Sequence, residues 1–261
     1  MKVRFLFSTI FGLAALAIPV VPANAQLTDQ VAREQASSTV RSQLHLKPDQ
    51  FFAVQRDEEL EQSLAVTIGR KVDPEFIYKV SPAGYEVKED TAVYHFWTDV
   101  DVVFIIAIGP EGGDVYRIHG FADSLAEFEN LLTASRVRVS SSDQAEFLAD
   151  FYRQVNPENL PLTRVSSLVE LKQAAERQCQ TSSFEQSEKA FDAWWRHAKQ
   201  LYANVVFRQT VALNGPGYVV EWIVLSSAGF GACGGAPLRT RLEVSSDGHV
   251  SRMTFSPVKN Q

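Results

Sequence analysis

The sequence predicts an α+β fold in which amphipathic helices pack on antiparallel β-sheets. Several segments repeat apolar residues at helical spacing, and the longest of them, 183–201, is followed by four strand-like runs. Short turns separate the first pair and the last pair of those runs, which favours antiparallel neighbours because a parallel pair needs a long crossover. We therefore expect the C-terminal part to be a helix followed by a four-stranded meander.

The first 25 residues predict a secretory signal peptide. Lys2 and Arg4 precede a short apolar run, and the segment ends in Ala23-Asn24-Ala25. Small residues at these positions are those that a signal peptidase reads, so we expect cleavage between Ala25 and Gln26. The apolar run is short and interrupted by proline for a membrane span. The sequence thus predicts export to a periplasm or to the medium, and the signal is of a bacterial type.

The elements of the N-terminal half follow in order. Apolar residues at four-residue spacing predict a helix over 28–46, and segment 57–66 has helical composition after a strand-like run at 51–56. Runs 76–80 and 84–89 flank a Ser-Pro-Ala turn and predict a hairpin. Runs 91–98, 101–109 and 114–121 predict two or three antiparallel strands, the middle one buried on both faces.

Two helices are expected next. Ser124 with Glu127 has capping-box spacing, and Leu125, Phe128 and Leu131 follow on one face. After a short predicted strand at 136–139, the run 140–143 opens a helix whose inner face holds a stripe of four residues, Leu148, Phe151, Tyr152 and Val155. Asn156-Pro157 ends that helix.

Segment 156–164 is the candidate domain boundary, because it has two prolines and no periodicity. We expect an N-terminal α+β region over 26–160 and a C-terminal α+β region over 161–261, with one continuous domain as the alternative. In the second region, Ser167 with Glu170 and Ser183 with Gln186 open a helical hairpin. In strand 238–244 the apolar residues alternate with charged ones, so we expect one packed face, covered by the aromatic helix 183–201.

Composition and charge exclude several classes of function. The chain is 45% hydrophobic, which suffices for a packed core and excludes global disorder. Its formal net charge is −6 and becomes −8 once Lys2 and Arg4 are removed with the signal. An acidic chain without a basic run does not suit nucleic acid as a partner. No segment after the signal is long and apolar enough to span a membrane, and we expect an unidentified protein or small molecule outside the cytoplasm as partner.

A glycine-rich stretch at 226–237 raises three alternatives. Gly229, Gly231 and Gly234 match the dinucleotide fingerprint, but a strand follows them where phosphate binding requires a helix N-terminus. We therefore expect no cofactor. A nucleophilic Cys233 would need a nearby base, with His197 and His249 as candidates. Since the chain holds only two cysteines and is expected outside the cytosol, the favoured prediction is a disulfide between Cys179 and Cys233.

Other candidates for chemistry are weak. His95, Asp99 and Asp101 form the densest titratable cluster; the two aspartates are candidate metal ligands, although two carboxylates favour a solvated strand edge over a metal site. Arg117 and His119 alternate with Tyr116 and Ile118, so they face water if the apolar pair faces the core. His95 and His119 remain the candidate catalytic bases.

The last 80 residues or so, a long helix before an antiparallel meander, resemble the cystatin-like and nuclear-transport-factor-like folds in layout. No motif supports this resemblance and it implies no function. Without a nucleophile constellation, metal signature or cofactor loop, the sequence favours a non-catalytic binding or interaction module. An exported hydrolase with dispersed catalytic residues, and a protease-inhibitor-like module suggested by the layout, are the alternatives.

Overall fold

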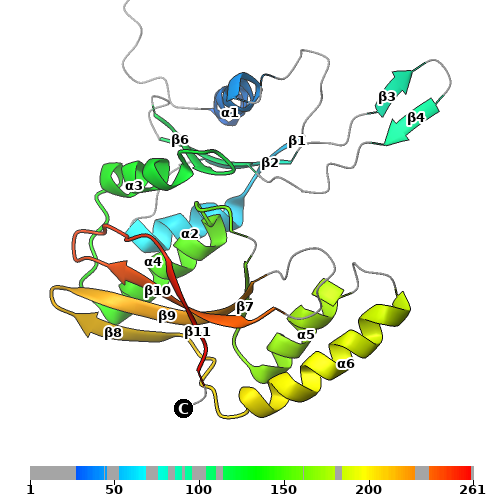
Figure 1. The fold of residues 1–261 in the computed structure, drawn as a ribbon. Coiled ribbons are helices and arrows are strands. Elements are labelled where there is room, and N and C mark those ends of the chain that lie inside the picture. Colours follow the sequence, from blue (N-terminus) through cyan, green and yellow to red (C-terminus); the bar gives the residue numbers. More distant parts are fainter. Residues whose placement is uncertain are drawn as a thin grey trace, which may run out of the picture.

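The computed structural model describes residues 28–43, 45, 53–68, 76–81, 86–89, 92–95, 104–109, 114–160, 162–179, 184–226 and 235–259. Within this part of the chain, helices and antiparallel sheets stack in layers (Figure 1). Helix α1 covers a four-stranded sheet, helices α2–α4 lie between this sheet and a five-stranded one, and α5 and α6 cover the far side. The predicted α+β class with antiparallel sheets is confirmed.

The helices are α1 (Asp29–Gln43), α2 (Glu58–Ile68), α3 (Ser124–Ala134), α4 (Ser142–Val155), α5 (Leu168–Cys179) and α6 (Phe184–Leu201). The strands are β1 (Ala53–Arg56), β2 (Phe76–Ser81), β3 (Glu86–Glu89), β4 (Ala92–His95), β5 (Phe104–Ile108), β6 (Val115–His119), β7 (Leu162–Val165), β8 (Thr210–Asn214), β9 (Gly217–Ser226), β10 (Pro237–Val244) and β11 (Thr254–Pro257). None of the helices in the described ranges is long and apolar enough to cross a bilayer.

The four-stranded sheet has the order β1-β2-β5-β6 and is buried on both faces at its centre. Every residue of β5 is buried, as predicted. Ile106 and Ile108 pack with the buried stripe of α1, whereas Ile105 and Ala107 face the core formed with α2–α4. This alternation is the two-residue period of a strand with apolar layers on both sides.

The central core is built around α4. The predicted inner stripe of this helix is buried, and the Phe128 ring of α3 lies 5.6 Å from Phe151 and 5.3 Å from Tyr152. Ser141 caps α4 by accepting a hydrogen bond from the Gln144 amide, and Asn156 ends the helix in a left-handed conformation. This core unites residues from both sides of segment 156–164. The division at residue 160 stays a prediction.

The five-stranded sheet confirms the predicted meander, because β8, β9, β10 and β11 pair in succession. Strand β7 pairs with the other end of β9. On β9, Val220 and Trp222 face the central core, while Ile223 and Leu225 face α5 and α6. Strand β9 is thus packed on both faces where the two helices cover it.

The aromatic helix α6 does not cover the face that the sequence analysis assigned to it. Leu242 and Val244 of β10 pack with α4 in the central core, and Phe191 of α6 packs with α5 and Ile223 on the opposite face. Helix α4 takes the inner position, where six of its residues are buried. The predicted Ser167 cap is present: the Ser167 hydroxyl accepts from the Glu170 amide at 3.1 Å. Ser183 lies outside the described residues.

Three local predictions are wrong. Strands β2 and β3 form no hairpin, since β2 pairs with β1 and β5, and β3 pairs with β4. Segment 136–139 forms no strand: Arg136 lies in a turn, and residues 137–139 belong to no sheet. Ser124 does not cap α3: it is the first helical residue, and its hydroxyl accepts from the Phe121 amide, while Glu127 lies near Arg117. Since β1 and β5 occupy both hydrogen-bonding edges of β2, no edge is left for β3.

Candidate functional site

A polar cleft opens where the four-stranded sheet meets the start of α2 and the end of α4. It encloses about 440 Å³. The residues that line it are Asp57, Glu59, Leu60, Lys79, Ile105, His119, Arg153, Gln154 and Asn156. His119, one of the two candidate bases from the sequence, therefore lies in a cavity with charged neighbours.

Strand pairing places Lys79 and His119 in one row. Lys79 of β2 is opposite Ile105 of β5, and Ile105 is opposite His119 of β6. Directly opposed residues of antiparallel strands project from the same face of the sheet. Ile105 belongs to the central core, so Lys79 and His119 lie on the side of α2 and α4.

This position corrects the expectation that His119 shares a solvent face with Arg117. The register between β5 and β6 shifts between Ile105 and Ile106, and Ile118 has no partner in the pairing. A bulge of this kind changes the direction in which the following side chain projects. Arg117 forms ion pairs with Asp123 and Glu127 of the α3 region, whereas His119 reaches the end of α4.

The orientation of the His119 ring follows from one hydrogen bond. Its Nδ1 lies 2.8 Å from the carbonyl oxygen of Asn156, which can only accept, so Nδ1 carries the proton in the neutral ring. Burial lowers the pKa of His119, and the charge of Lys79 lowers it further, against the opposing effect of the backbone carbonyls. The ring therefore favours its neutral form and offers Nε2 as an acceptor.

The backbone conformation and the side-chain hydrogen bond of Asn156 explain its position at the end of α4. It adopts φ 43°, ψ 65° at the end of α4, a conformation that asparagine tolerates better than most residues. Its side-chain amide donates to the Leu160 carbonyl at 2.7 Å and holds the loop after the helix. The carbonyl that orients His119 is thus fixed by the helix terminus itself.

The charged groups around His119 differ in how they are compensated. Asp57 caps α2 through the Leu60 amide at 3.1 Å, and Arg153 pairs with Asp150 at 2.9 Å. Lys79 is exposed and forms no ion pair with any described residue. Its ammonium is therefore the cation that remains available to a bound molecule.

The lining of the cleft also limits the reactions it could support. A neutral histidine can act as a base, but none of the described residues that line the cleft is serine, threonine or cysteine. A covalent mechanism would need such a nucleophile within hydrogen-bond reach of the base. The arrangement is suited to hydrogen bonding with a polar ligand.

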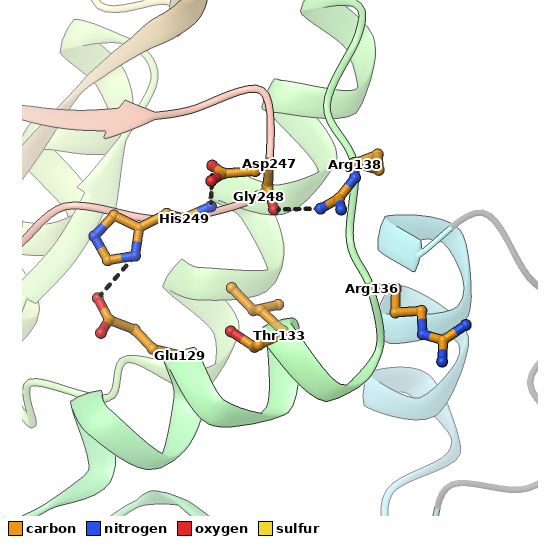
Figure 2. Close-up of a pocket in the computed structure, with 8 residues that line it drawn as sticks. Glu129, Thr133, Arg136, Arg138, Asp247, Gly248 and His249 are labelled. Atoms are coloured by element: carbon orange, nitrogen blue, oxygen red, sulfur yellow. Dashed lines mark hydrogen bonds and ion pairs between the residues drawn. The ribbon is translucent and has the colours of Figure 1, made fainter.

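A second pocket, of about 320 Å³, lies between α3 and the turn that joins β10 to the C-terminal strand (Figure 2). His249 Nδ1 is 3.8 Å from Glu129, and Arg138 donates to the Asp247 carbonyl at 3.2 Å. The Arg136 side chain points away from Asp247 and His249 (Figure 2). The polar groups of this pocket mainly bind one another. We therefore interpret it as the place where the turn at 247–249 packs on residues 136–139, not as a ligand site.

Several other candidates from the sequence lie outside the described residues. The backbone of His95 ends β4 opposite Glu86, but its side chain is not among those described, and Asp99 and Asp101 lie outside the described residues. In the described ranges no three His, Cys, Asp or Glu side chains gather to hold a metal ion. Cys179 is buried at the end of α5, and Cys233 lies outside the described residues, so their pairing stays a prediction.

Lys79, Arg153 and Asn156 were not identified from the sequence. Lys79 lies in a predicted strand, and Asn156 is predicted only to end a helix. Nothing local relates them to His119, because the cleft depends on strand pairing and on the packing of α4.

The fold and the cleft define a polar site on an α+β protein whose described strands form antiparallel sheets. Comparisons with protein-family models, with curated proteins and with solved structures each found no significant match to this chain.

Proposed function

We propose that the protein is an exported, non-catalytic binding protein whose ligand occupies the cleft at His119. The observation that carries this proposal is the pairing of an oriented, largely buried histidine with an uncompensated lysine on one row of the sheet. The His119 ring is held by its hydrogen bond to Asn156, so it is pre-organised and loses little entropy on binding.

The chemistry of the two groups indicates the class of ligand. Neutral His119 accepts a hydrogen bond at Nε2, while the Lys79 ammonium only donates. Their strands flank β5 and lie about 10 Å apart, so a ligand that fits both carries the donor and the acceptor on separate groups, as a compound with two amide groups does. Asp57 and Glu59 at the rim disfavour a highly charged anion such as a phosphate.

One observation favours a hydrolase as the second candidate. The lowered pKa of His119 keeps the imidazole neutral and therefore competent to take a proton from water. In that case a water molecule, activated by Nε2, would attack a bond held near Lys79. The two candidates differ in whether the bound molecule is cleaved.

Binding at the cleft can be tested on the purified protein with a panel of N-acetyl amino acid amides followed by NMR of ¹⁵N-labelled histidine. We expect the His119 ring signals to shift and the shift to be lost in Lys79→Ala. Exposed His197 on α6 is the internal control. Cleavage of an amide by the wild type, lost in His119→Gln, would support the hydrolase instead. If no amide perturbs His119, the proposed ligand class is wrong.

Export and the disulfide belong to the same proposal. We propose that residues 1–25 are removed and that Cys179 pairs with Cys233 in the mature chain. A loop of about 55 residues closed in this way contributes about 4 kcal/mol in the chain-entropy model. The mass of the unreduced mature protein after alkylation tests both points: we expect a chain that begins at Gln26, two hydrogens light and unlabelled. A labelled Cys233 would overturn the pairing.

A further inference from the structure

An apolar groove, distinct from both pockets described above, runs between α2 and α4 next to the His119 cleft. It encloses about 250 Å³ and shares Glu59 and Gln154 with that cleft. Buried Phe151 lies in its lining, and Val66 and Phe147 flank it from the two helices. Ser63 donates to Gln154 at 3.1 Å and joins the two helices along the groove.

The two flanking side chains are unusually exposed for their size. Val66 is 51% and Phe147 46% exposed. Phe147 directly precedes Leu148 in the buried stripe of α4 but is not part of that stripe. Single exposed apolar residues need no explanation, but two that meet in one groove from different helices mark a contact surface. Burying side chains of this kind stabilises a complex in proportion to the apolar area removed from water.

The surroundings of the groove are acidic. The first turn of α2 carries Glu58 and Glu59, and neither forms an ion pair with a described residue. On α4, Asp143 and Glu146 precede Phe147. Asp150 is already compensated by Arg153 and Arg164. The negative charge left over is on the N-terminal halves of both helices.

We propose that this groove is a docking site for a basic segment of a partner protein, one that inserts an apolar side chain between Val66 and Phe147 and places lysine or arginine beside the flanking carboxylates. A second copy of this chain fits poorly, because a two-fold contact would bring the same acidic surface against itself. Nucleic acid and anionic lipid are repelled by the same charge. This inference does not depend on a ligand at His119.

The test uses the peptide acetyl-Gly-Lys-Leu-Lys-Gly-amide and a matched peptide with alanine in place of leucine. Each is titrated into the ¹⁵N-labelled protein at low salt, and the backbone amide shifts locate the binding surface. We expect shifts at the amides of α2 and α4 near Val66 and Phe147. The leucine peptide should bind about tenfold more tightly than the alanine peptide, and Phe147→Ala should remove that difference. Raising the salt should weaken both peptides.

Val169→Ala provides the matched control, since Val169 is 65% exposed on α5 and remote from the groove. This variant should bind both peptides like the wild type. Equal affinity for the two peptides, or leucine selectivity that survives in Phe147→Ala, would overturn the proposal. So would self-association in solution that Phe147→Ala abolishes, because the occupant would then be a second copy. His119→Gln should leave peptide binding intact, which separates this site from the proposed ligand site.

Discussion

Arg252 Nε lies 3.2 Å from Glu158 Oε1, although the Glu158 side chain is only 5% exposed and that of Arg252 is 82% exposed. The pair joins the turn after α4 to the segment that precedes β11. Burial raises the pKa of Glu158, and the charge of Arg252 acts against this rise. Arg252 therefore stabilises a buried carboxylate from the surface.

Removal of this arginine should destabilise the protein in a pH-dependent way. In Arg252→Ala we expect the free energy of unfolding at pH 7.5 to fall by about 1–3 kcal/mol, because a buried carboxylate loses its charged partner. Because the pKa of Glu158 is raised in the folded state, the protonated acid stabilises the fold. This contribution is fully present below the pKa of the unfolded chain, near 4.5, and is lost as the pH rises through the folded pKa. The deficit of the variant should shrink toward pH 4.5.

Urea unfolding at the two pH values measures this effect. Arg33→Ala is the control, because Arg33 and Asp29 form an ion pair in which both side chains are about half exposed. A surface ion pair of this kind contributes little to the free energy of unfolding. An Arg252→Ala deficit of the same size at both pH values would show that Glu158 is not the group responsible.

Gly248 permits the turn to dock on the segment after α3. A Cβ at this position would lie 2.8 Å from Val137 Cβ and 2.9 Å from the Val137 carbonyl oxygen, and φ is +84°. Gly248→Ala should lower the free energy of unfolding by about 2–4 kcal/mol, because overpacking adds to the left-handed strain. Gly215 also has positive φ, +58°, but has nothing within 4 Å of its Cβ position. Gly215→Ala should therefore lose only about 1 kcal/mol, and equal losses in denaturant melts would contradict the role of Val137.

Local patterns predicted the helices well because each carries its own period and, in several cases, its own cap. The stripe of α4, the Ser167 cap and the stop at Asn156 are all properties of adjacent residues. Strand partners are a different matter. Run 76–80 is close in sequence to 84–89, yet β2 pairs with β1 and β5, because its core position depends on strands more distant in the chain.

The candidate site shows the same limit. His119 could be selected from the sequence as a titratable residue, but strict alternation placed it in solvent. The register shift opposite Ile105 and the carbonyl of Asn156, 37 residues away, determine its surroundings. Neither a bulge nor a helix-end carbonyl leaves a pattern in the residue types near position 119.

Arg136 occupies a position that favours glycine. It has φ 53° and follows Ser135, the C-cap residue of α3. Its amide donates to the Thr133 carbonyl, and the Val137 amide donates to the Leu132 carbonyl. These two hydrogen bonds define a Schellman motif, whose left-handed residue is usually glycine. Arg136→Gly should raise the free energy of unfolding by about 1 kcal/mol.

Ser135, next to Arg136, provides the control for this expected gain in stability. Ser135 has φ −73°, in the right-handed region, so Ser135→Gly should instead destabilise by about 0.5–1 kcal/mol. Thermal and urea unfolding of the two variants measure the difference. A loss of stability in Arg136→Gly would indicate that the arginine side chain makes a contact worth more than the strain.

The lowered pKa of His119 makes stability depend on pH in the opposite sense to Glu158. A buried base that resists protonation stabilises the fold above its unfolded pKa, near 6.5, and this contribution is lost as the pH falls. Between pH 7.5 and 5.5 the wild type should lose stability, with a slope of at most about 1.4 kcal/mol per pH unit from this one group.

His119→Gln should have a flatter profile over the same range, whereas His197→Gln, altered at an exposed position on α6, should retain the slope. Lys79→Ala should also reduce the slope, because the Lys79 charge contributes to the lowered pKa. An unchanged profile in His119→Gln would mean that other groups produce the acid sensitivity, and that the imidazole is not held neutral by its burial in the cleft.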